Sequence, residues 1–351
     1  MIQELHDIQT SANAIFTELT TGETVAVSFG NDPAAITATK QNVALCDRTH
    51  WGRIQITDSD RLRFLHNQTT NNINKLQPGQ GCDTVFVTST ARTIDLATAY
   101  ATEDAVLLLV SPNRRRQLLE LLDRYIFPMD RVELTDLTDT TVAFSLFGPG
   151  SSKLLAQIGV SELENQPYAT HKLSNIAGIE VRVAVGSGLA SPGYTLIASA
   201  KNAASLWKEL VKAGAVPMGD RIWEQLRIEQ GRPAADFELT DDYNPLEARL
   251  LHTITYDKGC YIGQETIARL NTYKGVKQQL WGVQLSGYVA PGTVVTIGEE
   301  KVGRLTSLTE TESGFFGLAY IRTKAGGEGL KVQVGETSGE VVNLPFLSNP
   351  F

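Results

Sequence analysis

The 351-residue chain has few cysteines and no long apolar run, and each absence excludes a class of protein. Its three cysteines, Cys46, Cys82 and Cys260, are an odd number spread over the sequence, which excludes the disulfide framework of a small secreted protein. No stretch approaches the roughly 18–20 apolar residues of a membrane-spanning helix. The first residues include acids and no uninterrupted apolar run, so we expect no signal peptide. These absences predict a reducing, cytoplasmic location and no membrane partner.

Several catalytic and metal-binding motifs are also missing. No two cysteines have the C-x2-C spacing, and Cys46 with His50 makes only half of a metal site, so we expect no bound metal. No G-x-S-x-G, P-loop or G-x-G-x-x-G motif joins a strand to a helix, which argues against acyl hydrolysis and nucleotide binding. With 31 Lys and Arg against 39 Asp and Glu, the net charge is −8, so direct binding of nucleic acid is not expected.

The spacing of apolar residues predicts two α+β segments followed by an all-β segment. Helices and antiparallel strands alternate in both α+β segments, which indicates helices packed on one face of a sheet. After about Lys277, short alternating strands separated by glycine-rich turns are typical of a small β-barrel. The expected strands are 52–57, 83–88, 93–100, 105–110, 141–147, 179–185 and 194–199. One expected helix has Asp58 or Ser59 as its N-cap, and the others cover 113–127, 151–158 and 203–213.

The segment KGCYIGQE, Lys258–Glu265, gives Cys260 surroundings that suit a reactive thiol. In an extended segment Lys258 projects to the same side as Cys260, and a nearby cation lowers the pKa of a thiol. Gly259 and Gly263 would let the backbone approach a ligand closely. The alternative is a small buried side chain in a tight turn, because free cysteine is among the most buried residues. The residues alone leave both interpretations open.

Charged residues in two other segments are candidates for ligand binding. Asp95 shares a strand face with Ala97 and Ala99, so space above the sheet could admit a ligand whose ring N–H groups bind the carboxylate. A solvated acid is the alternative. Arg227 and Glu229 come at the end of a predicted helix, where a ligand-facing pair and a surface ion pair are both open.

Four stretches resemble one known family. Residues 44–81, which begin ALCDRTHWGRIQIT, are similar to the opening of the glycine-cleavage T-protein (aminomethyltransferase) superfamily. LRIEQGRP (226–233), NPLEA (244–248) and KGCYIGQETIAR (258–269) resemble its folate-binding YgfZ-type branch, whose members support iron–sulfur enzymes, including enzymes that modify tRNA. The resemblance implies an α+β fold, a three-lobed ring of two α+β lobes around a central channel plus a C-terminal β-barrel. The expected lobes are 1–45 with 140–240, 46–139 with 241–276, and the barrel 277–351.

The resemblance also implies a site and a function. Tetrahydrofolate is expected in the channel, with Cys260 and Lys258 as the catalytic pair and with cofactor contacts from Asp95, Tyr100, Arg227, Glu229, Gln264 and Arg269. T-proteins usually carry two adjacent acids where this chain has Asp95 followed by Leu96, and Thr195 stands near the position of their pterin-binding glutamate.

These departures favour a tetrahydrofolate-binding accessory protein with an iron–sulfur protein as its partner. The alternatives are a folate-dependent aminomethyl transferase and a scaffold that binds folate without catalysing a reaction.

Overall fold

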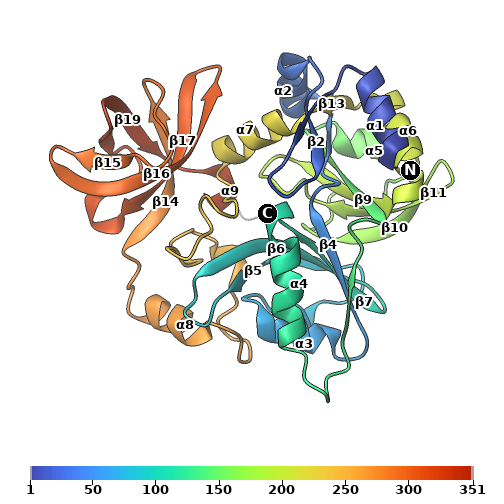
Figure 1. Cartoon of the computed structure of the whole chain (residues 1–351), viewed down its shortest axis with the longest axis horizontal. Coiled ribbons are helices and arrows are strands. Elements are labelled where there is room, and N and C mark those ends of the chain that lie inside the picture. Colours follow the sequence, from blue (N-terminus) through green and yellow to red (C-terminus); the bar gives the residue numbers. More distant parts are fainter. Residues whose placement is uncertain (1, 349–351) are drawn as a thin grey trace.

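The computed structural model of the chain describes residues 2–348, which form three bodies around a common centre (Figure 1). Two bodies are sheets covered by helices, and the third is a closed barrel, so the predicted α+β class with a C-terminal barrel is confirmed. None of the helices within residues 2–348 is long and apolar enough to cross a membrane.

The first lobe is built on a six-stranded sheet. Its order is β10-β11-β12-β9-β3-β13, and its helices carry their apolar residues on the side that faces the sheet. Phe144 and Leu146 of the sheet, for example, pack against Leu206 and Trp207 of a covering helix. The strands are β3 (Ala44–Asp47), β9 (Thr141–Phe147), β10 (His171–Ile176), β11 (Ile179–Val185), β12 (Gly193–Ser199) and β13 (Val216–Met218). The helices are α1 (Ile2–Ser11), α2 (Asp32–Gln41), α5 (Ser151–Gln157), α6 (Ala203–Lys212) and α7 (Asp220–Gln230), and a small sheet adds β1 (Ile15–Glu18) and β2 (Thr24–Ser28).

The second lobe is built on a five-stranded antiparallel sheet with the order β5-β6-β7-β4-β8. Its strands are β4 (Gly52–Thr57), β5 (Gly81–Val87), β6 (Thr93–Ala101), β7 (Ala105–Val110) and β8 (Glu133–Asp136), and its helices are α3 (Arg61–Gln68) and α4 (Arg115–Arg124). Helix α3 follows an N-cap at Asp60, so the predicted start at Asp58 or Ser59 is wrong by one or two residues. Asp58 has a φ of 73°, which belongs to a turn and not to a helix start.

The C-terminal body is a closed barrel with the order β14-β17-β16-β15-β18-β19. Its inward residues alternate with exposed ones, and a core of valine, leucine and isoleucine fills it. The strands are β14 (Gln278–Leu285), β15 (Val294–Ile297), β16 (Glu300–Thr311), β17 (Gly314–Arg322), β18 (Lys331–Val334) and β19 (Thr337–Val342). Before the barrel come the 3₁₀ turn η4 (Leu251–Thr253) and α8 (Gln264–Thr272), and after it comes α9 (Pro345–Ser348).

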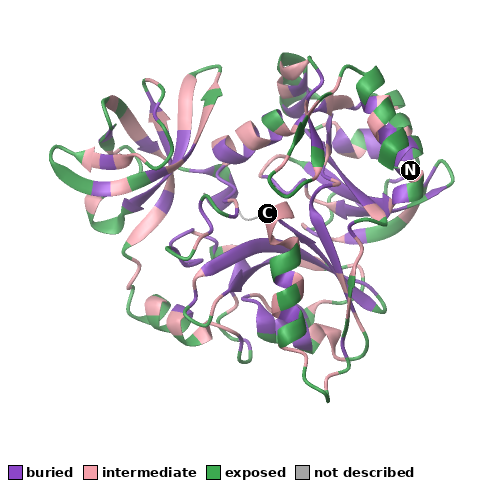
Figure 2. Cartoon of the chain, viewed as in Figure 1, coloured by how far each residue is buried: buried purple, intermediate pink, exposed green. Residues whose placement is uncertain are grey.

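The inner faces of the two sheets meet in a shared core. Tyr100 and Leu109 of the second sheet pack in one cluster with Phe147 and Ile197 of the first. Colouring by burial shows these strands to be buried almost throughout, whereas the outer faces of the covering helices are exposed (Figure 2). A polar side chain on either inner face therefore lies in the interior of the molecule.

A buried ion pair between Arg227 of α7 and Glu238, which follows that helix, is hydrogen-bonded to β16 of the barrel. Helix α7 also contacts the barrel through β16 and β17. Arg227 is fully buried, and its Nη1 lies 3.0 Å from Glu238, which is also fully buried. Its Nε donates to Glu224 at 2.8 Å, and its Nη2 donates to Ser307 of β16 at 3.1 Å. The other carboxylate oxygen of Glu238 accepts from Thr306 and Ser307, both at 2.6 Å. Arg227 therefore connects the first lobe to the barrel.

We expect Arg227→Met to destabilise the fold strongly. The substitution leaves the carboxylate of Glu238 buried without its cation, which should lower the free energy of unfolding by about 3–5 kcal/mol. Urea unfolding measures the change. Glu229→Gln on the same helix is the control, because Glu229 is half-buried and its carboxylate accepts a hydrogen bond from the neutral side chain of Gln225. The effect of this control should stay within about 0.5 kcal/mol. Equal effects of the two changes would contradict the connecting role of Arg227.

Candidate functional site

Asp83 is a carboxylate on the inner face of the second sheet. It lies in β5 opposite Thr98 of β6, and both side chains point toward the first lobe. Asp83 Oδ1 accepts from Thr98 Oγ1 at 2.6 Å and from Tyr168 Oη at 2.9 Å. Asp83 Oδ2 is buried and has no hydrogen-bond partner among the described residues. The two hydroxyl groups thus orient a carboxylate that keeps one acceptor oxygen available.

Arg48 reaches the same interior from the first lobe. It follows β3, and its guanidinium lies 3.7 Å from the centroid of the Trp51 ring. Its Nη1 donates to the carbonyl of Ser187 at 3.1 Å, whereas its Nε has no partner within residues 2–348. Gly188 leaves room for this group, because a Cβ at that position would come within 2.7 Å of Nη1.

Arg232 is placed by the end of α7. Gly231 has a φ of 87°, which ends the helix, and the N–H groups of Gly231 and Arg232 both donate to the carbonyl of Arg227 at 2.8 Å. The guanidinium of Arg232 then lies 5.5 Å from the centroids of both the Trp51 and Phe346 rings. Its Nη1 is buried and lacks a partner in the described part of the chain.

His252 and Trp223 complete the group. The Nε2 atom of His252, in η4, lies 4.0 Å from Asp83 Oδ2, and the Nε1 atom of Trp223, in α7, is also buried. Neither nitrogen has a partner among the residues that the structure describes. We call Arg48, Asp83, Trp223, Arg232 and His252 the interlobe cluster. Each contributes a buried polar atom without a partner, which is uncommon in folded proteins and indicates a place for a ligand or water.

The charges of the cluster follow from its burial. Burial lowers the pKa of Arg48 to about 10, with a further contribution from Arg232, so Arg48 stays charged at neutral pH. Burial also lowers the pKa of His252, while Asp83 opposes that shift, so the imidazole is neutral at neutral pH. Burial and the charge of Asp83 raise the pKa of Tyr100, which remains a hydroxyl donor. The site therefore offers two cationic donors and one carboxylate.

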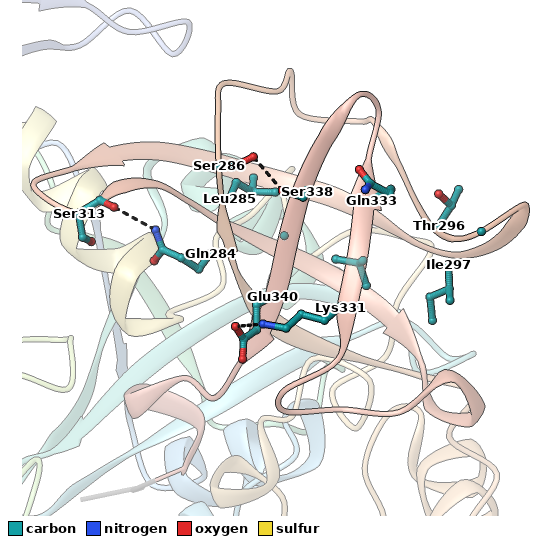
Figure 3. Close-up of a pocket in the computed structure, with 13 residues that line it drawn as sticks. Gln284, Leu285, Ser286, Thr296, Ile297, Ser313, Lys331, Gln333, Ser338 and Glu340 are labelled. Carbon is teal, nitrogen blue, oxygen red and sulfur yellow. Dashed lines mark hydrogen bonds and ion pairs between the residues drawn. The ribbon is translucent and has the colours of Figure 1, made fainter.

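A cavity of about 200 Å³ adjoins the cluster, lined in part by Trp51, Ser111, Trp223 and Arg232. A larger groove of about 470 Å³ lies on the barrel, where Lys331 and Glu340 form an ion pair (Figure 3). The charged groups that line that groove thus neutralise each other. We therefore place the candidate site between the lobes.

Asp95, a predicted ligand contact, is already bound within the chain. Its two oxygens accept from Ser111 Oγ at 2.6 Å and Ser111 N at 2.9 Å. Ala97 and Ala99, on the same strand face, pack in the cluster that also contains the apolar residues of α3 and α4. The space predicted above Ala97 and Ala99 is therefore filled by helices, whereas a ligand contact of Asp95 stays a prediction.

The structure separates the other predicted contacts. Tyr100 lies on the inner face beside the cluster, and the charges of Asp83 and Arg48 both act on it. Arg227 and Glu229 do not face each other, because Arg227 pairs with Glu238 and Glu229 accepts from Gln225 at 2.8 Å. The expected pair, whether ligand-facing or on the surface, is therefore wrong.

The KGCYIGQE segment divides its side chains between the interior and the surface. Lys258 is buried, and its Nζ donates to the carbonyls of His66 and Thr69 at 2.6 Å and of Asn71 at 2.7 Å. Cys260 is exposed, so the predicted placement of both side chains on one side is wrong. Burial lowers the pKa of Lys258 to about 7, but three carbonyl oxygens bind the ammonium form, so we expect the charged form at neutral pH.

The remaining two predicted contacts lie on α8. The amide of Gln264 donates to the carbonyl of Lys258 at 3.4 Å, which stabilises the turn before the helix. Arg269 is exposed in the last turn of α8. Ligand roles for Gln264, Arg269 and Cys260 stay predictions.

The sequence contained signals for part of the interlobe cluster. Asp83 is a charged residue within an otherwise apolar strand, CDTVFV, and Arg232 is part of the LRIEQGRP stretch that carries the family resemblance. No sequence feature marked His252 as a member of the cluster, because Asp83, the residue that it faces, is distant in sequence. Of the two arginines in LRIEQGRP, Arg232 thus belongs to the interlobe cluster, whereas Arg227 is paired with Glu238.

Comparison with known proteins identifies the family. Residues 5–258 match the family described as the GCVT N-terminal domain. The chain belongs to this family. It is 47% identical over 327 residues to a chloroplastic protein of Arabidopsis thaliana named as a transferase without a stated substrate, covering 92% of this chain and 76% of that one.

More distant relatives include enzymes of known name. The chain is 27% identical over 344 residues to an aminomethyltransferase of Halalkalibacterium halodurans, covering 93% of this chain and 92% of that one. The crystal structure of glycine cleavage system aminomethyltransferase T from Bartonella henselae has the same fold, with a TM-score of 0.88, 18% identity, and 98% and 97% of the two chains covered. Because one relative is chloroplastic, the cytoplasmic location stays a prediction.

We expect Lys258→Met to destabilise the fold without changing the thiol. The substitution removes three hydrogen bonds from buried carbonyls, which should lower the free energy of unfolding by roughly 3 kcal/mol in urea. The rate of Cys260 labelling by a thiol reagent should stay within about twofold of wild type, because the ammonium group does not face the thiol. Lys153→Met, on the exposed face of α5, is the control for stability. A several-fold slower labelling rate would instead support the catalytic pairing of Lys258 with Cys260.

We expect Asp95→Asn to change the pH dependence of stability. Burial raises the pKa of Asp95 to about 6 in the folded chain, whereas an unfolded aspartate titrates near ~3.9. The folded state thus binds more protons in this window, and the carboxylate costs stability as the pH rises from about 4 to about 6. Relative to wild type, the free energy of unfolding of the variant should rise across that window by up to about 3 kcal/mol, and the difference should stay constant above it. Urea unfolding at a series of pH values measures this, and a difference independent of pH would contradict the raised pKa.

Proposed function

We propose that this chain binds a reduced folate between its lobes and acts as an accessory protein for iron–sulfur enzymes. One observation carries the ligand part of the proposal: each residue of the interlobe cluster has a buried polar atom without a hydrogen-bond partner among the described residues, and two of these residues, Arg48 and Arg232, lie beside Trp51. Leaving such an atom unpaired costs about 1–3 kcal/mol, so a ligand that pairs several of them would be bound strongly. Family membership supports the choice of a folate, since the family includes aminomethyltransferases.

The donors and acceptors of the cluster fit the ring of a folate. The pterin ring presents amino and ring N–H donors next to a carbonyl oxygen. Asp83 Oδ2 can accept from the donors, and the guanidinium groups of Arg48 and Arg232 can donate to the carbonyl. Trp51 and Trp223 offer flat apolar surface beside these polar groups. When bound, tetrahydrofolate would supply a nitrogen that carries one-carbon units.

The accessory role depends on Cys260. Its thiol is exposed, so a partner protein could reach it without a change in this fold. The KGCYIGQE segment that holds it resembles the branch whose members support iron–sulfur enzymes. Both features support a role in which the thiol acts on a partner's cluster.

A second candidate is aminomethyl transfer, which the enzymes at 27% identity support. Two features oppose it. Both oxygens of Asp95 are occupied by Ser111, and Thr195 stands where the resemblance places a glutamate. Turnover of an aminomethyl donor by the purified chain, lost in Asp95→Asn, would favour transfer over the accessory role.

Calorimetric titration with tetrahydrofolate tests the ligand. We expect wild type to bind and Arg232→Gln to bind about 10- to 100-fold more weakly, because the variant loses a charge-assisted hydrogen bond. Arg116→Gln, on the exposed face of α4, is the matched control and should bind as wild type does. Absence of binding by wild type would contradict the folate site.

Replacement of Cys260 in cells that lack the native protein tests the accessory role. We expect Cys260→Ser to lose the support of iron–sulfur enzyme activity that wild type restores. Cys82→Ser is the control, because the Cys82 thiol is only partly exposed beside the helices of the second lobe, and burial raises its pKa to about 12. Full activity with Cys260→Ser would contradict a role for the thiol, and failure of wild type to restore activity would contradict the accessory function.

A further inference from the structure

We infer that Asp83, on the second lobe, is the acid that recognises the amino edge of the proposed ligand and sets its specificity. This inference rests on the proposed folate site and adds the residue that binds the amino edge of the pterin ring. It moves the acid from β12, where the resemblance expects it, to β5 on the opposite sheet.

Strand β12 cannot provide this acid. Thr195 is buried on the inner face, and its hydroxyl already donates to the carbonyl of Gly186 at 2.9 Å. A threonine carries no charge and cannot form a charge-assisted hydrogen bond with an amino group. A ligand that presents N–H donors between the lobes therefore needs an acceptor from another element.

Asp83 meets that need. Its side chain is 1% exposed, and its Oδ1 is held by the hydroxyl groups of Thr98 and Tyr168. These two bonds orient the carboxylate and leave Oδ2 without a partner among the described residues. A second buried carboxylate oxygen without a partner belongs to Glu23, but it lies in a different cavity, beside α1. Asp83 is thus the orphan carboxylate that faces the interlobe cluster.

The surroundings of Oδ2 indicate the chemistry of the group that it binds. His252 Nε2 lies 4.0 Å away, which is too long for a hydrogen bond, so neither atom satisfies the other. A ligand N–H group next to Oδ2 would pair the carboxylate. The guanidinium of Arg232 and the ring of His252 both lie close to the Phe346 ring, at 5.5 Å and 5.8 Å from its centroid, so a donor for a carbonyl oxygen lies in the same region as the acid. An acceptor next to a donor is complementary to the edge of a 2-amino-4-oxo pyrimidine ring, which presents N–H donors next to a carbonyl oxygen.

A comparison of two ligands tests this assignment. Calorimetric titrations use tetrahydrofolate and its 2-desamino-2-methyl analogue, which keeps the shape of the ring but lacks the amino donors. Wild type should bind tetrahydrofolate about 10- to 100-fold more tightly than the analogue, the effect of one charge-assisted hydrogen bond. In Asp83→Asn this preference should fall to within about threefold, because the carboxylate is lost while the shape is kept. Glu23→Gln is the matched control and should keep the preference of wild type.

The outcomes separate this inference from the proposed function. If wild type binds tetrahydrofolate and Asp83→Asn keeps the full preference, Asp83 does not read the amino edge, although the folate site stands. If wild type binds neither ligand, the proposed function fails and this inference fails with it. If thermal melting shows that Asp83→Asn does not fold, Asp83→Ser replaces it. That variant also removes the carboxylate, and an unchanged preference there would overturn the inference.

Discussion

Two guanidinium groups lie buried between the facing sheets, and much of the interior is arranged around them. Arg48 and Arg232 come from different elements and approach the same Trp51 ring. Burying a charge away from water is costly unless it is paired or hydrogen-bonded. The carbonyl of Ser187 and the face of Trp51 offset part of that cost. The part that remains unpaired is the reason to place a ligand there.

The barrel contributes to this interior although it supplies none of the cluster residues. Arg227 and Glu238 hold α7 against β16, and the end of α7 directs Arg232 between the lobes. Residues after the barrel return to the centre, where Phe346 packs near Arg232 and His252. A change at the barrel interface could therefore alter the site through α7. The stability of the fold and the position of Arg232 are coupled in this architecture because α7 contributes to both.

The KGCYIGQE segment shows how a conspicuous motif can combine two roles. Its lysine is an internal clamp that binds the carbonyls at the end of α3, and its cysteine is a surface thiol. The ammonium group is held by three buried carbonyls and does not face the thiol. The same short segment therefore contributes one side chain to the interior and leaves another exposed at the surface.

Local sequence determined which segments become helices and strands in most of the chain. The alternation in GRIQIT and AVLLLV and the apolar stripe of 203–213 predicted β4, β7 and α6 correctly, because periodicity reports which side chains are buried. Capping was predicted less well, as the start of α3 shows, since neighbouring acids and serines compete for the same position.

Tertiary structure alone decided which polar residues share a site. Asp83 and His252 are far apart in sequence, and only the packing of η4 against β5 brings them within 4.0 Å. The sequence placed Arg227 and Asp95 correctly on their elements. It could not reveal that Arg227 is paired with Glu238 and that Asp95 accepts hydrogen bonds from Ser111. Periodicity specifies the face on which a side chain lies. It does not specify what covers that face, because the covering residues come from other parts of the chain.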